Sequence, residues 1–285
     1  MSSTLQHAYQ HCEQITRREA RNFYFGFISL PRFRRQSISA IYALSRRWDD
    51  IADGDLPREE KKKRLKKEEE SLNSIETPFD DPVYTAVRHT IGRFDIPLYY
   101  FHDLLDGVRL DLTRKRYHTF DDLLDYCYHV ASCPGLIVLE IFGYEDDAAR
   151  EYARKLGYAM QLTNILRDVR KDLERDRIYL PLNRLKAEGV TEQDLLGNNP
   201  PPAVTHVMRS LASEADTYFR QSNRLFPLIT PSSRTCPLIL MQLYRTLLKK
   251  LKRRNFDVFS SPVNLSFAEK CMVLFDSIFF HPAAI

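Results

Sequence analysis

Apolar residues recur at helical spacing along most of this chain, and no segment alternates apolar and polar residues as a half-buried strand would. Glycine is scarce, at 9 of 285 residues, although sandwiches and doubly wound sheets use glycine in their turns. No sequence period of 20–50 residues is present, which argues against solenoids and propellers. The pattern predicts an all-α fold in which roughly eight to ten helices form a single domain over residues 1–285.

Prolines and charged segments divide this pattern into successive helices. The predicted helices span residues 4–27, 32–53, 83–93, 97–111, 119–142, 147–174, 203–228, 235–254 and 266–279. The charged stretch GDLPREEKKKRLKKEEE follows the second helix, and opposite charges four residues apart, as in Lys66 and Glu70, favour a solvated helix face. Leu180 and Pro181 end the regular pattern, and three consecutive prolines predict a loop over residues 195–204.

The composition excludes several classes of protein. Lysine and arginine total 42 against 38 acidic residues, and a net charge of +4 is too mild to indicate a nucleic-acid-binding protein. The five cysteines are scattered without a Cys-x-x-Cys pair, which is typical of reduced thiols and not of disulfides or a zinc site. The polar first residues are unlike a signal peptide, and no apolar stretch approaches about 18 residues. We therefore expect a cytoplasmic location.

Two predicted helices each carry polar residues along one stripe. In ISAIYALSRRWDDIAD, Arg46, Asp49 and Asp53 are spaced i, i+3 and i+7. In GYAMQLTNILRDVRKD, four polar residues share one stripe in the same way: Gln161, Asn164, Asp168 and Asp172. The second helix is apolar on most other sides, so it is expected to be buried with its polar stripe facing a cavity.

Carboxylates that face a cavity need a positive partner, because burying an unpaired charge is costly. Arg46 or Arg167 could neutralise one acid but not four. Oxygen ligands on two facing helices suit Mg²⁺, which is usually held by one or two carboxylates together with substrate phosphates. The two stripes therefore predict a magnesium and diphosphate site that would stabilise a departing diphosphate.

Alternative chemistries fit the two stripes less well. One pair of aspartates four residues apart is usually part of a solvated helix face, but here two such pairs lie among apolar residues. A di-iron bundle needs Glu-x-x-His on two helices, and no glutamate here has a histidine three residues later. The sequence contains no P-loop, no Gly-x-Gly-x-x-Gly and no Gly-x-Ser-x-Gly, so nucleotide binding and hydrolase chemistry are unsupported.

At these residues the chain resembles the squalene and phytoene synthase family of head-to-head prenyl transferases. The matching stretches are NFYFGFISLP (22–31), AIYALSRRWDDIADGD (40–55), YCYHVASCPG (126–135), QLTNILRDVRKDLERDRIYLP (161–181) and LYRTLLKKL (243–251). The resemblance implies an isoprenoid-synthase bundle around a central cavity. It also implies that Mg²⁺-dependent chemistry joins two identical allylic diphosphates through a cyclopropyl diphosphate.

The resemblance implies roles for individual residues. The implied metal-binding positions are Asp49, Asp53, Asn164, Asp168 and Asp172, and the four aspartates among them are also implied to be catalytic, together with Tyr126. Positions at or near the diphosphates are Arg21, Asn22, Arg46, Arg177, Tyr179 and Tyr244, with Asn22 standing where serine is usual. Tyr126 takes the place of a tyrosine that assists ionisation or proton transfer, Gln161 lines the cavity, and Phe23 lines the prenyl channel.

The resemblance also bears on the product. The stretches DDIADGDLP, 94–112 and 141–144 are most similar to bacterial enzymes that convert two farnesyl diphosphates (C15) to presqualene diphosphate for squalene or hopanoid synthesis. A phytoene synthase that joins two geranylgeranyl diphosphates (C20) is the alternative. A squalene synthase would also need NADPH, for which no site is indicated. A non-catalytic binding or assembly member of the fold is the remote alternative.

Two further expectations concern shape and surroundings. Pro134 removes a backbone N–H inside a predicted helix, so it should kink that helix and reshape the cavity. A long lipid product favours brief contact with a membrane surface, through the apolar C-terminal segment or the basic residues from Lys249 to Arg254.

Overall fold

The computed structural model describes residues 2–20, 24–197 and 201–279. It confirms the all-α prediction: in these residues, backbone pairing of the β type is limited to two isolated bridges, Arg116 with Ile178 and Tyr144 with Ile229. The helices of the first half are α1 (Ser3–Glu19), α2 (Tyr24–Phe27), α3 (Arg32–Asp53), α4 (Arg58–Asn73), α5 (Pro82–Phe94), α6 (Leu98–Thr113), α7 (Phe120–Cys127) and α8 (Cys133–Phe142). Those of the second half are α9 (Ala148–Glu174), α10 (Leu182–Ala187), α11 (Glu192–Leu196), α12 (Pro202–Ser222), α13 (Pro231–Arg253) and α14 (Phe267–Phe279).

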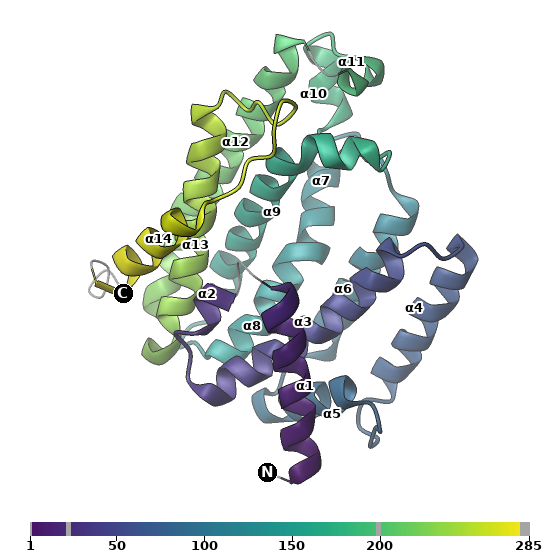
Figure 1. Ribbon diagram of the computed structural model, residues 1–285, viewed down its shortest axis with the longest axis vertical. Coiled ribbons are helices and arrows are strands. Elements are labelled where there is room, and N and C mark those ends of the chain that lie inside the picture. Colours follow the sequence, from purple (N-terminus) through teal and green to yellow (C-terminus); the bar gives the residue numbers. More distant parts are fainter. Residues whose placement is uncertain (1, 21–23, 198–200, 280–285) are drawn as a thin grey trace.

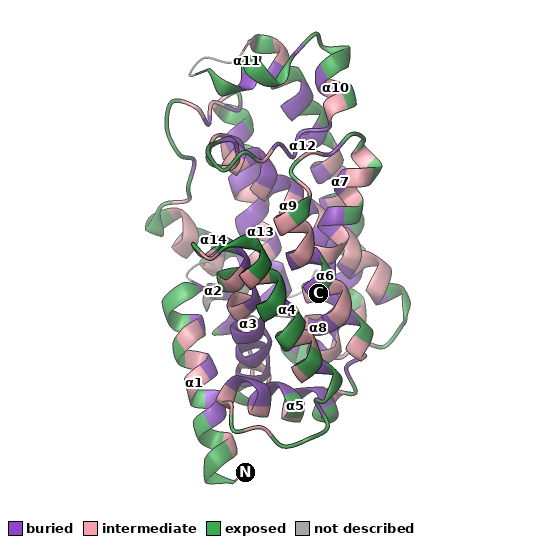
Figure 2. Cartoon of the chain, turned by 90° about the vertical axis from the view of Figure 1, so that its right-hand side faces the viewer, coloured by how far each residue is buried: buried purple, intermediate pink, exposed green. Residues whose placement is uncertain are grey.

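Helix α9 lies inside the bundle, where it packs against α8, α12 and α13 (Figure 1). One hydrophobic core extends from α1 to the loop after α13, and it includes the fully buried Trp48 of α3. Helix α4 stands at the edge of the bundle and is exposed along most of its length (Figure 2). The polar stripes predicted on α3 and α9 therefore belong to helices that the core holds in place.

The chain reverses direction immediately after α9. Asp176 adopts a left-handed conformation with φ of 57°, and the backbone then runs beside the segment after α6. Ile178 donates its N–H to Lys115 O at 2.9 Å, next to the bridge with Arg116. This return brings Arg177 and Tyr179 beside the end of α6, so two segments distant in sequence meet near the polar stripes.

The helix predicted over residues 119–142 is continuous but irregular. Tyr128–Ser132 form a π-helical turn, which separates α7 from α8. Pro134 lies in the first turn of α8 and has no N–H to donate to the preceding turn. The irregularity beside it takes the form of the π-helical turn. Gly157 of α9 allows the close approach of this turn, because a Cβ there would lie 2.7 Å from Ser132 Cα.

Some predicted boundaries are wrong. The helix expected over 4–27 ends at Glu19, and helical structure resumes at Tyr24, because Ala20 leaves helical geometry with ψ of 40°. The sequence pattern predicts no regular structure directly after Pro181, but α10 and α11 form there, and α11 begins with a capping box between Thr191 and Asp194. Among the described residues, no helix is both long and apolar enough to cross a lipid bilayer.

Candidate active site

Helix α3 presents Asp49 and Asp53 one turn apart near its C-terminal end. Desolvation raises the pKa of Asp49 to about 7, and the charges of Asp111 and Asp53 contribute to that rise. The Asp49 side chain nevertheless remains exposed to solvent. Asp49 therefore contacts solvent while the neighbouring carboxylates favour its protonated form.

Two arginines from the end of α9 reach across to this first acidic pair. Arg175 Nη1 and Arg177 Nη2 each lie 3.4 Å from a carboxylate oxygen of Asp53. The Arg177 side chain is mostly buried, at 15% exposure. Its positive charge also opposes the rise that burial causes in the pKa of Asp172. Arg177 therefore links the acidic residues of α3 electrostatically to those of α9.

The second acidic set lies on α9. Asp168 is paired with the neighbouring Arg167, whose Nε donates to Asp168 Oδ1 at 2.9 Å. Asp172 forms no ion pair among the described residues, and burial, with the charge of Asp168, raises its pKa to about 7. One turn before Asp168, the side-chain Oδ1 of Asn164 is buried without a hydrogen-bond partner in the described structure.

The remaining predicted residues of α9 and α13 surround Asn164. Its Nδ2 donates to Gln161 Oε1 at 3.2 Å. The buried phenol of Tyr244, on α13, contacts the Asn164 side chain, and burial raises the pKa of that phenol. Gln161, Asn164 and Tyr244 thus lie together.

Tyr126 and Tyr179 meet at a carboxylate that the sequence interpretation missed. Tyr126 donates to Asp111 Oδ1 at 3.0 Å, Tyr179 donates to the same oxygen at 3.3 Å, and the two phenol oxygens are 3.2 Å apart. Burial and the charge of Asp111 raise the pKa of Tyr126. The available signal was an acid between Leu110 and Leu112 in an apolar helix, the same pattern that identified the α9 stripe.

Arg46 lies at the side of the acidic pair. Its Nη2 is 2.7 Å from Asp50 Oδ1, while its Nε is buried without a partner in the described structure. Its positive charge opposes the rise in the pKa of Asp49. Arg46 also lines a surface pocket with three further cations: Arg18, Arg47 and Arg64. Asp50 also lines this pocket, and each of the four arginines is paired with a carboxylate.

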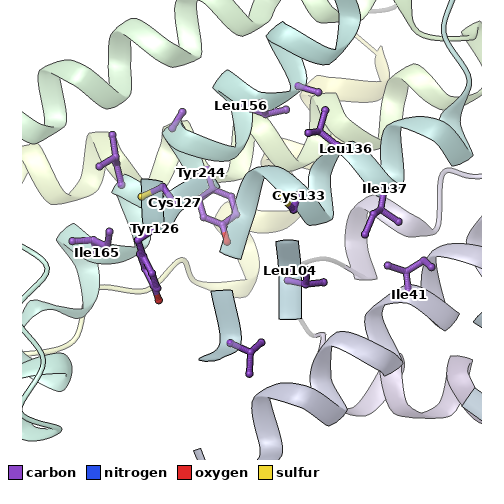
Figure 3. Packing of buried hydrophobic residues seen from close by; sticks show 14 of the residues in the cluster. Ile41, Leu104, Tyr126, Cys127, Cys133, Leu136, Ile137, Leu156, Ile165 and Tyr244 are labelled. Carbon is purple, nitrogen blue, oxygen red and sulfur yellow. The ribbon is translucent and has the colours of Figure 1, made fainter. Parts of the chain in front are cut away.

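Apolar side chains from several helices lie near the two buried tyrosines (Figure 3). In that view the phenol ends of Tyr126 and Tyr244 are turned in the same direction. The labelled apolar residues come from α3, α6, α8 and α9: Ile41, Leu104, Leu136, Ile137, Leu156 and Ile165. Polar groups of the site are thus bordered by an extended apolar region.

The described residues form no ready-made metal site, since no three histidine, cysteine or acidic side chains converge there. The donor set still fits Mg²⁺ bound together with a diphosphate, because that ion needs only one or two carboxylates besides phosphate oxygens. Asp49 and Asp172, without ion pairs in the described structure, and the unpartnered Asn164 oxygen are suitable donors. The predictions for Arg21, Asn22 and Phe23 concern positions outside the described residues.

Comparison with known proteins shows the class to which this helical chain belongs, a family of prenyl transferases. The model of the squalene/phytoene synthase family matches residues 16–269, and the chain belongs to that family. It is 37% identical over 272 residues to phytoene synthase of Mycobacterium tuberculosis, covering 94% of this chain and 90% of the relative. It is 36% identical to phytoene synthase of Arthrospira platensis, covering 95% and 93%.

Solved structures agree with this assignment. A dehydrosqualene synthase in complex with ligand superposes with a TM-score of 0.88 at 32% identity, covering 97% of each chain. Squalene synthase HpnC from Alicyclobacillus acidocaldarius gives a TM-score of 0.85 at 26% identity, covering 90% of this chain and 97% of that one. The chain is therefore a member of a family of head-to-head prenyl transferases whose named relatives include both phytoene and squalene-type synthases.

Proposed function

We propose that this chain joins two identical allylic prenyl diphosphates head to head, through a cyclopropyl diphosphate, in a Mg²⁺-dependent reaction. The supporting observation is the arrangement of the acids: Asp49 and Asp172 lie on separate helices, carry raised pKa values and form no ion pair among the described residues. Bound Mg²⁺ would supply positive charge to the leaving diphosphate. Its proposed protein ligands are Asp49, Asp53, Asn164, Asp168 and Asp172.

The chain's own groups have distinct tasks in this proposal. Arg46 and Arg177 add positive charge beside the diphosphates, and this charge stabilises the developing anion as the C–O bond breaks. The apolar side chains around Tyr126 exclude water, which would otherwise quench the allylic cation. Aromatic rings stabilise that cation electrostatically.

Tyr126 is one of two candidates to accept the proton that leaves when the cyclopropane closes; the released diphosphate is the other. The phenol donates its hydrogen to Asp111 at 3.0 Å, so it could take up the departing proton while its own hydrogen passes to the Asp111 carboxylate. Asp111 holds that phenol in place through the hydrogen bond at 3.0 Å, and the phenol oxygen of Tyr179, which donates to the same carboxylate oxygen, lies 3.2 Å away.

Two substrate lengths have separate support. The relatives from Mycobacterium tuberculosis and Arthrospira platensis are phytoene synthases, which favours C20 geranylgeranyl diphosphate and carotenoid synthesis. The solved structures are a dehydrosqualene and a squalene synthase, which favours C15 farnesyl diphosphate and the presqualene diphosphate of squalene or hopanoid synthesis. The enzyme would work at a membrane surface without crossing the bilayer, because its substrates and products are lipids.

Mass spectrometry of the products distinguishes these proposals. The purified chain is incubated with Mg²⁺ and either farnesyl or geranylgeranyl diphosphate, with and without NADPH. We expect a condensed product from one diphosphate, and no change on adding NADPH. Reduction of the product by NADPH would indicate a squalene synthase. If neither diphosphate gives product, and a prenyl diphosphate analogue with Mg²⁺ leaves the melting temperature unchanged, the proposal is wrong and a non-catalytic role is favoured.

A further inference from the structure

Helix α14 exposes large apolar side chains along one side. Four residues make up this surface, called here the α14 face: Phe267 (73% exposed), Met272 (64%), Phe275 (53%) and Phe279 (61%). At 100° per residue they cover an arc of about 140°. They are half of the eight exposed large apolar residues in the described structure, and the others are Ile28, Phe33, Tyr99 and Leu196. A clustered apolar face of this kind marks an interaction surface.

The opposite side of α14 is fixed to the bundle. Val273 is buried against Ile239 and Leu243 of α13. Glu269 also accepts hydrogen bonds from Lys250 Nζ at 3.0 and 2.9 Å. Because these contacts hold the helix, the α14 face is presented outward and cannot turn into the core without breaking them.

A row of cations borders the same helix. Arg245, Lys249 and Arg253 follow one another at four-residue intervals on α13, and none forms an ion pair with a described residue. Arg245 and Lys249 line a groove along α14, and Asp276 is the single acid among the described residues that line it. An apolar helix face beside unpaired cations is complementary to an anionic lipid surface, which offers phosphates above hydrocarbon.

We propose that the α14 face docks on an anionic phospholipid bilayer, with the phenylalanines entering the interface and the cation row contacting lipid phosphates. This inference rests on the proposed function, since such an enzyme takes up and releases lipids. A second copy of the chain is a poorer occupant. The four side chains expose on the order of 500 Å², whereas a standard interface buries about 800 Å² per partner.

Vesicle sedimentation without substrate tests the apolar part. We expect the wild-type chain to bind phosphatidylcholine vesicles containing phosphatidylglycerol, and Phe275→Ser/Phe279→Ser to bind at least tenfold more weakly. The control Tyr99→Ser/Leu196→Ser removes two exposed apolar side chains elsewhere, at 54% and 66% exposure, and should bind like wild type. Equal binding by both double variants, or no binding by wild type, overturns the proposal.

Replacing the cations tests the electrostatic part. Arg245→Gln/Lys249→Gln/Arg253→Gln should lose roughly fivefold in binding per cation on anionic vesicles and little on neutral ones. The matched control on α4 is Lys63→Gln/Lys66→Gln/Lys67→Gln, which removes three exposed cations that form no ion pair with a described residue. If the control loses as much binding as the α13 variant, general charge and not this surface drives association.

A fluorophore locates the contact directly. The chain has one tryptophan, the fully buried Trp48, so Phe275→Trp adds a single surface reporter. Brominated lipid should quench the emission of the introduced indole and leave Trp48 emission in wild type unchanged. Absence of quenching, or loss of a dimer in Phe275→Ser/Phe279→Ser by analytical ultracentrifugation, would overturn the proposal in favour of a protein partner. Because none of these measurements uses substrate, they fail independently of the proposed reaction.

Discussion

Helices α4 and α9 both carry acidic residues, but their surroundings differ. Of the 16 residues in α4, Leu65 and Leu72 are the buried ones. Several of its charges pair with near neighbours, as in Lys62 with Glu59 at 2.8 Å, while Glu69 pairs with Arg109 of α6 at 2.7 Å. Helix α9 buries eleven of its 27 residues. Hydrogen bonding to Lys62 lowers the pKa of Glu59, whereas burial raises the pKa of Asp172 to about 7.

The difference shows that burial, and not the number of charges, makes an acidic helix chemically useful. Water and mobile side chains neutralise the α4 charges at almost no energetic cost, so no ligand is needed there. In α9, protein surrounds Asp172, and this carboxylate has no ion-pair partner among the described residues. A bound cation would therefore stabilise it more than it would stabilise an acid of α4. Substitutions in the two helices should therefore have very different effects.

The largest expected effect is the loss of turnover in Asp172→Asn. Removing one electrostatic stabiliser of a transition state costs about 3–4 kcal/mol, so the rate of product formation should fall roughly 10²–10³-fold with Mg²⁺ present. The matched control is Glu70→Gln on α4, which should retain wild-type turnover. Near-normal turnover of Asp172→Asn would remove that residue from the site. A melting temperature no lower than that of wild type would show that the loss is not caused by unfolding.

Asp111 provides the next test, because it is half-buried and accepts hydrogen bonds from two buried phenols. Asp111→Leu leaves the phenols of Tyr126 and Tyr179 without their shared acceptor, so the free energy of unfolding should fall by about 1–3 kcal/mol. Asp111→Asn keeps an acceptor oxygen and should lose less. Urea unfolding measures both. Equal losses in the two variants would show that the negative charge, and not the hydrogen bonds, matters.

The two environments also explain what could be predicted from sequence. The apolar positions around Asp168 correctly indicated that α9 is buried, and the helix boundaries there agree within one residue; the functional role of its polar stripe stays a prediction. Asp111 has similar apolar neighbours, but its convergence with Tyr126 and Tyr179 was missed. That convergence depends on the chain reversal at Asp176, which brings residue 179 back to α6 and leaves no local sequence pattern.

Short elements were the other part that sequence could not supply. The π-helical turn at Tyr128–Ser132 depends on Gly157 of α9, which lets Ser132 approach closely, whereas the proline at 134 indicated only that some distortion would occur. Helices α10 and α11 are too short for periodicity to be detected. Tertiary packing determines the local structure of these segments.

The pH dependence of stability is a smaller effect with a defined sign. Asp49 and Asp172 have folded-state pKa values of about 7, whereas an unfolded aspartate titrates near 3.9. Between these values the folded state binds more protons, so these two groups should make the free energy of unfolding fall as the pH rises from about 4 to 7. Urea unfolding of wild type and Asp172→Asn across this range measures the contribution, and identical slopes would contradict it.

Magnesium binding should follow the opposite trend, because its ligands must be deprotonated. We expect the affinity for Mg²⁺ with a prenyl diphosphate analogue to increase up to tenfold per pH unit below 7 for each proton released, and thermal shifts at pH 6 and 8 measure this. In Asp111→Asn the increase should occur at lower pH, because the Asp111 charge raises the pKa of Asp49. A thermal shift independent of pH would contradict both assignments.

The smallest effect is expected on α4. Arg64→Ala removes an exposed ion pair with Glu60 at 3.2 Å and should change the free energy of unfolding by no more than about 0.5 kcal/mol. Leu65→Ala, at the neighbouring buried position, should cost about 2–5 kcal/mol, because it leaves a cavity where the helix meets the bundle. Urea unfolding of the two variants measures the contrast. Similar losses would mean that the charged face of α4 stabilises the fold as its apolar contacts do, and the distinction between the two helices would then fail.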